Sequence, residues 1–200
     1  MSLLTLAKKH KCTKLEHSHY IKLYETYLDA VPDEMTMLEI GIQDGGSIRM
    51  WHDFFPEATI YGIDKKLKVN FTSKRIVLIE GRQEDSGIYK QVPSGLSLVI
   101  DDGGHTMKQQ QVAFEYCWPK LANGGLYVIE DLHTSYWPHF GGEINGEQTT
   151  VVFLCQLINA MNYAAIRSSR AENYRQRSIA FGGEVAWIHC YESICFIGKK

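Results

Sequence analysis

The sequence predicts a single α/β domain built on a doubly wound, mostly parallel sheet with an antiparallel hairpin at its carboxyl end. Short apolar runs alternate with segments of helical periodicity, which is typical of parallel strands that helices cover on both faces. Two adjacent strand-like runs near the carboxyl terminus are typical of a hairpin. The length of 200 residues suits one well-buried core, so residues 1–200 are expected to form one domain.

The first expected element is a helix over residues 20–30, within an amino-terminal helical segment that covers residues 1–33. Ile21, Tyr24 and Leu28 recur there at helical spacing, and a proline followed by an aspartate then breaks the pattern. Later apolar runs predict strands at residues 35–40, 59–63, 76–79, 96–100 and 125–129. Helical segments are expected between strands at residues 48–55, 85–91 and 107–118.

The segment of residues 132–148 is expected to be an active-site loop. It is rich in glycine and aromatic residues, has neither helical nor strand periodicity, and follows a strand end, where long loops are usually functional. Its Tyr136, Trp137 and Phe140 could stack against a ligand or simply pack the loop onto the domain.

The remaining elements are a helix at residues 149–163, a polar connection at 167–177 and strands at 185–191 and 193–198. Four arginines in the connection could meet an anionic group, although a solvated connection is the simpler interpretation. Helical spacing assigns the following residues of the last two helices to the core: Phe114, Cys117, Trp118, Leu154, Leu157, Ile158 and Met161.

The composition argues against nucleic-acid and membrane partners. The formal net charge is −2, from 21 basic and 23 acidic side chains, and no basic tract of the kind that binds nucleic acid is present. The chain shows no secretory signal pattern and no apolar run of membrane-spanning length. Its five cysteines are odd in number and lack CxxC spacing, so reduced thiols and a cytoplasmic location are expected.

Acidic residues follow two of the expected strands at the point where each ends. Asp102 follows one strand, and Glu130 with Asp131 follows the next strand along the chain. If these strands are parallel neighbours, the three carboxylates meet at the sheet edge where open α/β folds bind ligands. Such close like charges need a cation, and oxygen ligands without nearby cysteine or paired histidine suit Mg²⁺ or Mn²⁺ better than zinc. His105, three residues after Asp102, is placed to accept a proton there.

A structural role for the same acids stays open. Asp101 and Asp102 could cap the following helix, and Glu130 and Asp131 could be exposed acids at a strand end. Both pairs at adjacent strand ends, with His105 between them, favour the metal site.

The stretch MLEIGIQDGGSIRMW runs from a strand through a glycine-rich turn into a helix. Gly41 would allow close approach of a ligand, and Ser47 could cap the new helix, whose amino end attracts negative groups. Asp64, at the end of the next strand, could bind a ribose, or it could be a solvated strand-end acid. Glu39 would repel a pyrophosphate but suits an amine or a sulfonium, which favours S-adenosylmethionine over a dinucleotide.

The segments LEIGIQDGGS, YGID, EGRQED, IDDGGH and LANGGLYVIEDLHTSYWPHFGG, taken in order, resemble class I S-adenosylmethionine-dependent methyltransferases. More narrowly, residues 14–142 resemble the metal-dependent sugar O-methyltransferases of macrolide biosynthesis, of the macrocin and mycinamicin type. The resemblance implies a Rossmann-like fold, with metal ligands at Asp102, Glu130 and Asp131 and a general base at His105. The expected cofactor set comprises Glu39, Gly41, Ser47, Asp64, Gln83 and Asp101.

Two departures from the family pattern limit what the resemblance carries over. The macrolide enzymes have an additional amino-terminal domain without a counterpart in this sequence, so a macrolide substrate is not implied. Gly104 stands where many relatives have serine.

The leading hypothesis is an S-adenosylmethionine- and Mg²⁺-dependent O-methyltransferase that acts on a hydroxyl of a sugar or glycosylated small molecule. A catechol-like acceptor would satisfy the same metal and is the first alternative. A non-catalytic S-adenosylmethionine-binding protein is the second. The sequence leaves the oligomeric state undecided, and a homo-oligomer is one alternative because a neighbouring subunit could complete the pocket.

Overall fold

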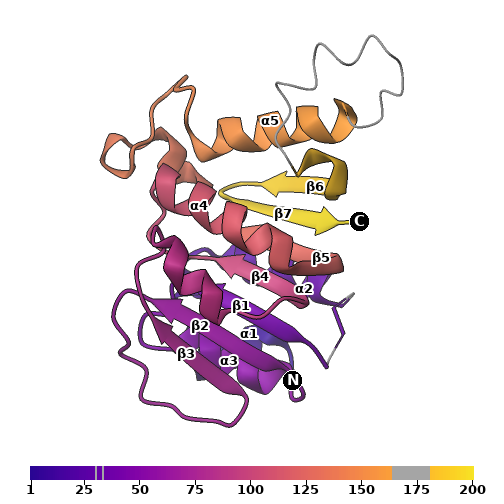
Figure 1. Cartoon of the computed structure of the whole chain (residues 1–200). Helices are drawn as coiled ribbons and strands as arrows, with labels where there is room; N and C mark the ends of the chain where they lie inside the picture. The colour runs from indigo at the N-terminus through magenta and orange to yellow at the C-terminus, as the bar shows by residue number, and fades with distance from the viewer. Residues whose placement is uncertain (30, 33, 164–180) are drawn as a thin grey trace.

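A computed structural model describes residues 1–29, 31–32, 34–163 and 181–200 and shows a seven-stranded sheet in the order β3-β2-β1-β4-β5-β7-β6 (Figure 1). The first five strands are parallel, and β7 runs antiparallel to both β5 and β6. The predicted fold class is therefore confirmed. The strands are β1 Thr36–Ile40, β2 Thr59–Asp64, β3 Ile76–Glu80, β4 Leu96–Asp101, β5 Leu121–Ile129, β6 Val185–Tyr191 and β7 Ile194–Lys199.

Helices cover both faces of this sheet (Figure 1). One face carries α1 Leu3–Lys9, α2 Ser18–Leu28 and α3 Gly46–Phe54, and the other carries α4 Met107–Cys117 and α5 Thr150–Tyr163. The expected helix at 85–91 is a 3₁₀ helix over Ser86–Gln91, and residues 65–75 between β2 and β3 form a loop. Further 3₁₀ helices are Thr13–Glu16, Trp118–Lys120, Leu132–Tyr136, Pro138–Phe140 and Gly182–Glu184.

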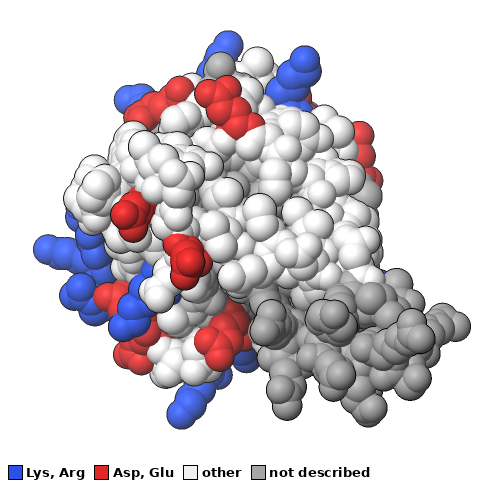
Figure 2. All heavy atoms as spheres, turned by 90° about the horizontal axis from the view of Figure 1, so that it is seen from above, with Lys and Arg blue, Asp and Glu red and all other residues white. Residues whose placement is uncertain are grey.

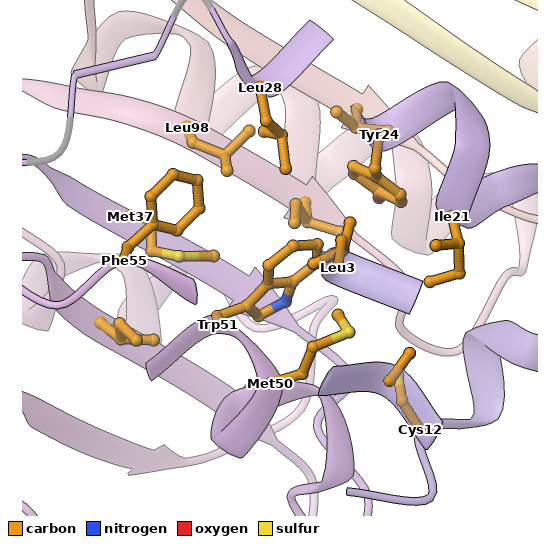
Figure 3. Close-up of a cluster of buried hydrophobic side chains, with 14 of the residues drawn as sticks. Leu3, Cys12, Ile21, Tyr24, Leu28, Met37, Met50, Trp51, Phe55 and Leu98 are labelled. Carbon is orange, nitrogen blue, oxygen red and sulfur yellow. The ribbon is translucent and has the colours of Figure 1, made fainter. Parts of the chain in front are cut away.

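Buried side chains form one apolar cluster on each face of the sheet, because successive strand residues point to opposite faces. Met37 belongs to the first cluster and Leu38 to the second. In the first cluster, Trp51 of α3 packs beside Tyr24 of α2, with ring centroids 5.3 Å apart (Figure 3). Of the residues predicted for the core, Phe114, Cys117, Trp118, Leu154 and Leu157 are buried and Met161 packs against the second cluster, whereas Ile158 is 38% exposed and that prediction is wrong.

The strand order reverses between β1 and β4, which lie side by side at the centre of the sheet. Backbone hydrogen bonds align the carboxyl ends of the strands: Asp102 N donates to Ile40 O at 2.9 Å, and Glu130 N donates to Asp101 O at 2.9 Å. This arrangement brings the predicted acids to the switch point of the sheet, where doubly wound folds bind their ligands.

Lys and Arg side chains are interspersed with Asp and Glu on the face shown in Figure 2. Among the described residues, no helix combines the length and apolar character needed to cross a membrane. The four arginines expected in a polar connection lie outside the described residues.

Asp53 of α3 fastens the amino-terminal helix to the domain. Its Oδ2 accepts hydrogen bonds from Lys9 Nζ at 2.7 Å and from His10 Nε2 at 2.8 Å. Lys9, with His10 and His52, holds the pKa of the Asp53 carboxyl well below its usual range.

We expect Asp53→Asn to lower the free energy of unfolding at pH 7 by less than about 1 kcal/mol, because these ion pairs are partly exposed. Since the folded-state pKa is depressed, the contribution is complete above the ordinary carboxyl pKa of 3.8 and is lost as the pH falls below it. Urea unfolding of both proteins between pH 7 and pH 3 measures this. A stability difference that grows on acidification would contradict the assignment.

Candidate active site

Asp102, His105 and Asp131 converge at the carboxyl ends of β4 and β5. Each offers a metal-ligating atom, and these atoms lie within 4.8 Å of one another. His105 Nε2 is 3.4 Å from Asp131 Oδ2 and 4.0 Å from Asp102 Oδ1. All three side chains are about one-fifth exposed, so a small ion and a substrate can reach them.

A buried ammonium group lies on the other side of Asp102. Lys14 Nζ is 2.6 Å from Asp102 Oδ2, 2.7 Å from Glu130 Oε1 and 3.2 Å from Glu39 Oε1. Only 1% of the Lys14 side chain is exposed. Burial alone would lower the pKa of Lys14, but the charges of Asp102, Glu130 and Glu39 raise it well above its ordinary value, so the ammonium stays charged.

The three predicted metal ligands therefore form two overlapping groups that share Asp102. The histidine group consists of Asp102, His105 and Asp131. The lysine group consists of Lys14 and the carboxylates of Asp102, Glu130 and Glu39. Glu130 also accepts a hydrogen bond from Tyr24. The Glu130 side chain is only 2% exposed, and burial together with the charge of Asp102 raises its pKa above the ordinary value. Lys14 was not among the predicted site residues.

His105 lies immediately before the capping residue of α4, Thr106, and has a left-handed backbone φ of 57°. Thr134 Oγ1 holds this backbone by donating to His105 O at 2.9 Å. Among the described residues, His105 Nδ1 is buried without a hydrogen-bond partner. The imidazole is thus held by its backbone, and its Nε2 faces the two aspartates.

The amino-terminal segment also reaches the metal-side acids. Tyr20 OH lies 3.0 Å from Asp131 Oδ1 and 2.9 Å from Ser193 O. His17 stacks on the Tyr20 ring, and its Nε2 is 3.7 Å from Asp131 Oδ1. The structure therefore places both residues beside Asp131.

Glu39 lies buried under the glycine-rich turn. Its Oε2 accepts from Ser47 Oγ at 2.7 Å, and its Oε1 accepts from Trp51 Nε1 at 3.2 Å. The prediction that Ser47 caps α3 is wrong: Gly45, with φ of 83°, is the capping residue, and Ser47 lies within the first turn. A serine at the second residue of the helix is free to bond Glu39 instead.

The other predicted cofactor residues line the same sheet edge. Asp64 Oδ2 accepts from Ile42 N at 3.1 Å and Gln43 N at 2.9 Å, so this acid closes the glycine turn onto β2. Gln83 Nε2 donates to Asp101 Oδ1 at 2.6 Å. Burial raises the pKa of Asp101 to about 8, and its Oδ2 has no partner among the described residues.

The departure at Gly104 affects the neighbourhood of Gln83. Gly104 N donates to Gln83 Oε1 at 2.9 Å. A Cβ at Gly104 would lie 2.2 Å from Gln109 Oε1, so a serine here would require the flexible end of Gln109 to move.

Two cavities adjoin the site. A small one of about 10 Å³ lies at the glycine turn and is lined by Thr13, Gly41 and Asp102, among others. A larger one of about 760 Å³ lies between α4, α5 and the predicted active-site loop, with Thr106, Phe140 and Gln148 in its walls. The ring of Phe140 is also 6.4 Å from the His105 ring, so the larger cavity shares a wall with the histidine group.

These residues fit both groups that the sequence analysis implies. The carboxylate oxygens of Asp102 and Asp131 lie within 4.8 Å of each other, and hard oxygen donors of this kind suit a divalent cation. At the glycine turn, a Cβ on Gly41 would lie 1.9 Å from Asp102 O, so the turn brings the cofactor side within backbone contact of the metal side.

The architecture and this site define a class I methyltransferase fold. A solved structure of MycE, a methyltransferase of the mycinamycin pathway in complex with Mg, SAH and mycinamycin VI, matches with a TM-score of 0.85 and 29% identity, covering 100% of this chain and 53% of that chain. A putative ribosomal RNA methyltransferase from Plasmodium falciparum, at 13% identity and a TM-score of 0.56, shares the fold alone. No family model matches the chain.

Relatives in sequence identify the family within this class. Mycinamicin VI 2''-O-methyltransferase from Micromonospora griseorubida is 33% identical over 90% of this chain. An 8-demethyl-8-alpha-L-rhamnosyl tetracenomycin-C 2'-O-methyltransferase from Streptomyces olivaceus is 30% identical over 99% of it. The chain is thus a homologue of the macrocin- and mycinamicin-type sugar O-methyltransferases. It spans about half the length of these relatives, 47% and 54% respectively.

Proposed function

We propose that the chain is an S-adenosylmethionine- and Mg²⁺-dependent O-methyltransferase that acts on a hydroxyl of a sugar or a glycosylated small molecule. The observation that carries the proposal is the convergence of Asp102, His105 and Asp131 beside a glycine turn that covers a buried glutamate. The names of the relatives support this choice, since they describe O-methylation in mycinamicin and tetracenomycin pathways.

The proposed metal ligands are Asp102 and Asp131, which face each other across His105, and Glu130, which requires its contact with Lys14 to open. When bound, a divalent ion supplies positive charge that acidifies a chelated hydroxyl. The proposed cofactor residues are Glu39, Gly41, Ser47, Asp64, Gln83 and Asp101.

His105 acts as the general base in this proposal. Its Nε2 takes the hydroxyl proton while the oxygen forms a bond to the methyl carbon. The carbon–sulfur bond breaks with its electron pair, which remains on sulfur, so the sulfonium becomes the neutral thioether of S-adenosylhomocysteine. Asp131 Oδ2 lies 3.4 Å from His105 Nε2, so this nitrogen faces the proposed metal ligands.

The cavity of about 760 Å³ is the proposed acceptor site. Its volume lies within the range of about 300–1,000 Å³ that small-molecule sites occupy. Gln111 and Gln148 can bond sugar hydroxyls, and Phe140 and Phe153 can pack against the apolar face of a sugar ring. Polar groups on several sides suit a glycoside better than a flat, largely apolar catechol.

The functional test is calorimetry with S-adenosylmethionine and Mg²⁺, followed by methyl transfer to a panel of deoxysugar glycosides and a simple catechol. We expect micromolar cofactor binding, and Mg²⁺-dependent methylation of a glycoside. Absence of cofactor binding at millimolar concentration would end the proposal. Turnover of catechol and of no glycoside would assign the alternative acceptor.

A cytoplasmic location is part of the proposal. The cysteines Cys12, Cys117, Cys155, Cys190 and Cys195 are free thiols, which suits a reducing compartment.

A further inference from the structure

We propose that Lys14 is a built-in counter-cation of this site and that it leaves its carboxylates when Mg²⁺ and S-adenosylmethionine bind, so that residues 10–16 act as a cover over the cofactor site. This inference rests on the proposed function. It assigns a role to a residue outside the predicted metal and cofactor sets.

The contacts of Lys14 connect the two halves of the site. An ammonium has three hydrogens to donate, and three carboxylate oxygens surround Lys14 Nζ at 2.6 to 3.2 Å. Asp102 and Glu130 are proposed metal ligands, whereas Glu39 is a proposed cofactor residue. One side chain therefore holds oxygens from both ligand sets.

The segment that carries Lys14 lies over the glycine turn. A Cβ on Gly46 would be 3.0 Å from His10 O and 3.4 Å from Cys12 Cα, so the two backbones are in close contact. The side chain of Cys12 is 2% exposed and lies in the apolar cluster between the helices (Figure 3). Thr13 lines the small cavity at the turn.

The space left under this cover is too small for the cofactor. The cavity at the glycine turn measures about 10 Å³, whereas small-molecule and cofactor sites measure about 300–1,000 Å³. Among the residues that line this cavity, Thr13 is the one that comes from outside the sheet edge, the glycine turn and the start of α3. The cover is therefore the wall whose movement admits a nucleoside-sized ligand.

The local backbone structure lowers the free-energy cost of moving this segment. Lys11 has a left-handed φ of 52°, a backbone conformation that is unfavourable for a non-glycine residue. Lys14 itself lies in a 3₁₀ helix of 4 residues, Thr13–Glu16, whose hydrogen bonds have poorer geometry than those of an α-helix. The cover is therefore held by the burial of Cys12, by the ion pairs of Lys14 and, at its amino end, by the contact of His10 with Asp53.

The ligands compete for the oxygens that Lys14 holds. A divalent ion presents twice the charge of an ammonium to Asp102 and Glu130, and the amine and sulfonium of the cofactor offer positive charge to Glu39. Binding of the metal ion and the cofactor thus replaces the positive charge that Lys14 supplies to the three carboxylates, and the Lys14 side chain moves into solvent. Glu130 then becomes free to join Asp102 and Asp131.

Amine labelling tests the exchange directly. The wild-type chain is treated briefly with an N-hydroxysuccinimide ester, with and without Mg²⁺ and S-adenosylhomocysteine, and modification of each lysine is measured by peptide mass spectrometry. We expect labelling of Lys14 to rise at least tenfold when both ligands are present. Lys199 is the control and its labelling should not change: its side chain is 10% exposed, and its Nζ donates to Trp118 O at 3.0 Å and Leu121 O at 3.1 Å.

Unchanged or slower labelling of Lys14, in samples where calorimetry shows that both ligands are bound, would overturn the exchange while leaving the proposed function intact. Failure of either ligand to bind would overturn both.

A second test uses Lys14→Met, which keeps the length of the side chain and removes the charge. We expect Mg²⁺ to bind this variant at least tenfold more tightly than wild type, and Mg²⁺ to raise its Tm by more than that of wild type. Lys14→Arg should bind Mg²⁺ no more tightly than wild type. Weaker Mg²⁺ binding by Lys14→Met would instead make Lys14 a positioning residue that holds Asp102 and Glu130 for the metal.

Discussion

His105→Ala should lower kcat for methyl transfer by about 10²–10⁴-fold, the usual contribution of a general base, while leaving the Kd for S-adenosylmethionine unchanged. The reason is geometric. His105 Nε2 faces Asp131 Oδ2 at 3.4 Å and Asp102 Oδ1 at 4.0 Å, whereas the glycine turn that would hold the cofactor makes no hydrogen bond to the imidazole. Single-turnover kinetics separates the chemical step from binding, and calorimetry gives the Kd.

The same variant distinguishes a base from a metal ligand. As a base, His105 can be removed with little change in the Kd for Mg²⁺, because Asp102, Asp131 and Glu130 supply the proposed ligands. A loss of Mg²⁺ affinity that parallels the loss of kcat would make His105 a ligand. His189→Ala is the control: His189 bonds the Tyr27 hydroxyl at 2.7 Å on the β6 side of the sheet, and its removal should leave kcat unchanged. Wild-type turnover by His105→Ala would refute both roles.

The fold followed closely from the sequence because buried parallel strands are marked by their apolar character. All the predicted strands form, and the strand at 125–129 extends back to Leu121. Differences arise where local patterns are weaker. Pro119 ends the α-helical pattern that Trp118 seemed to continue, and the short segment 86–91 forms a 3₁₀ helix with too few residues for a stable α-helix.

The sequence allowed the acidic residues of the site to be predicted, but not Lys14, which supplies its positive charge. The strand ends placed Asp102, Glu130 and Asp131 together, and the electrostatic argument required a positive charge among them. A metal ion was the cation expected there. Lys14 lies 88 residues from Asp102 and 116 from Glu130 in a polar segment that has no local signal of burial. Its position depends on how the chain before α2 packs over the sheet edge, which periodicity does not encode.

The contacts of His17 and Tyr20 show the same limit. His17 and Tyr20 reach Asp131 because α2 begins beside the end of β5, a contact between segments more than 100 residues apart. Ser47 shows the opposite case, because a local rule suggested that it caps a helix, whereas its hydroxyl donates a hydrogen bond to the buried Glu39. At this site the tertiary contacts decided which polar side chains meet.

Gly41→Ala should be the most destabilising single change near the site. Gly41 has φ of 85°, and an added Cβ would lie 1.9 Å from Asp102 O and 2.6 Å from Gly103 Cα. The left-handed backbone costs about 1–2 kcal/mol for a non-glycine residue, and forcing a methyl group against packed backbone adds about 1–3 kcal/mol. We therefore expect the free energy of unfolding to fall by about 3 kcal/mol or more in urea titrations at pH 7.

Gly95→Ala is the control that introduces the same backbone strain without the clash. Gly95 has the same φ of 85°, but an added Cβ there meets no heavy atom within 4 Å, so the loss should stay near 1–2 kcal/mol. Because relief of the clash at Gly41 has to displace the backbone of Asp102, Gly41→Ala should also bind Mg²⁺ more weakly than Gly95→Ala. Equal losses of stability in the two variants, with equal Mg²⁺ affinity, would show that β1 and β4 do not approach each other as closely as this site requires.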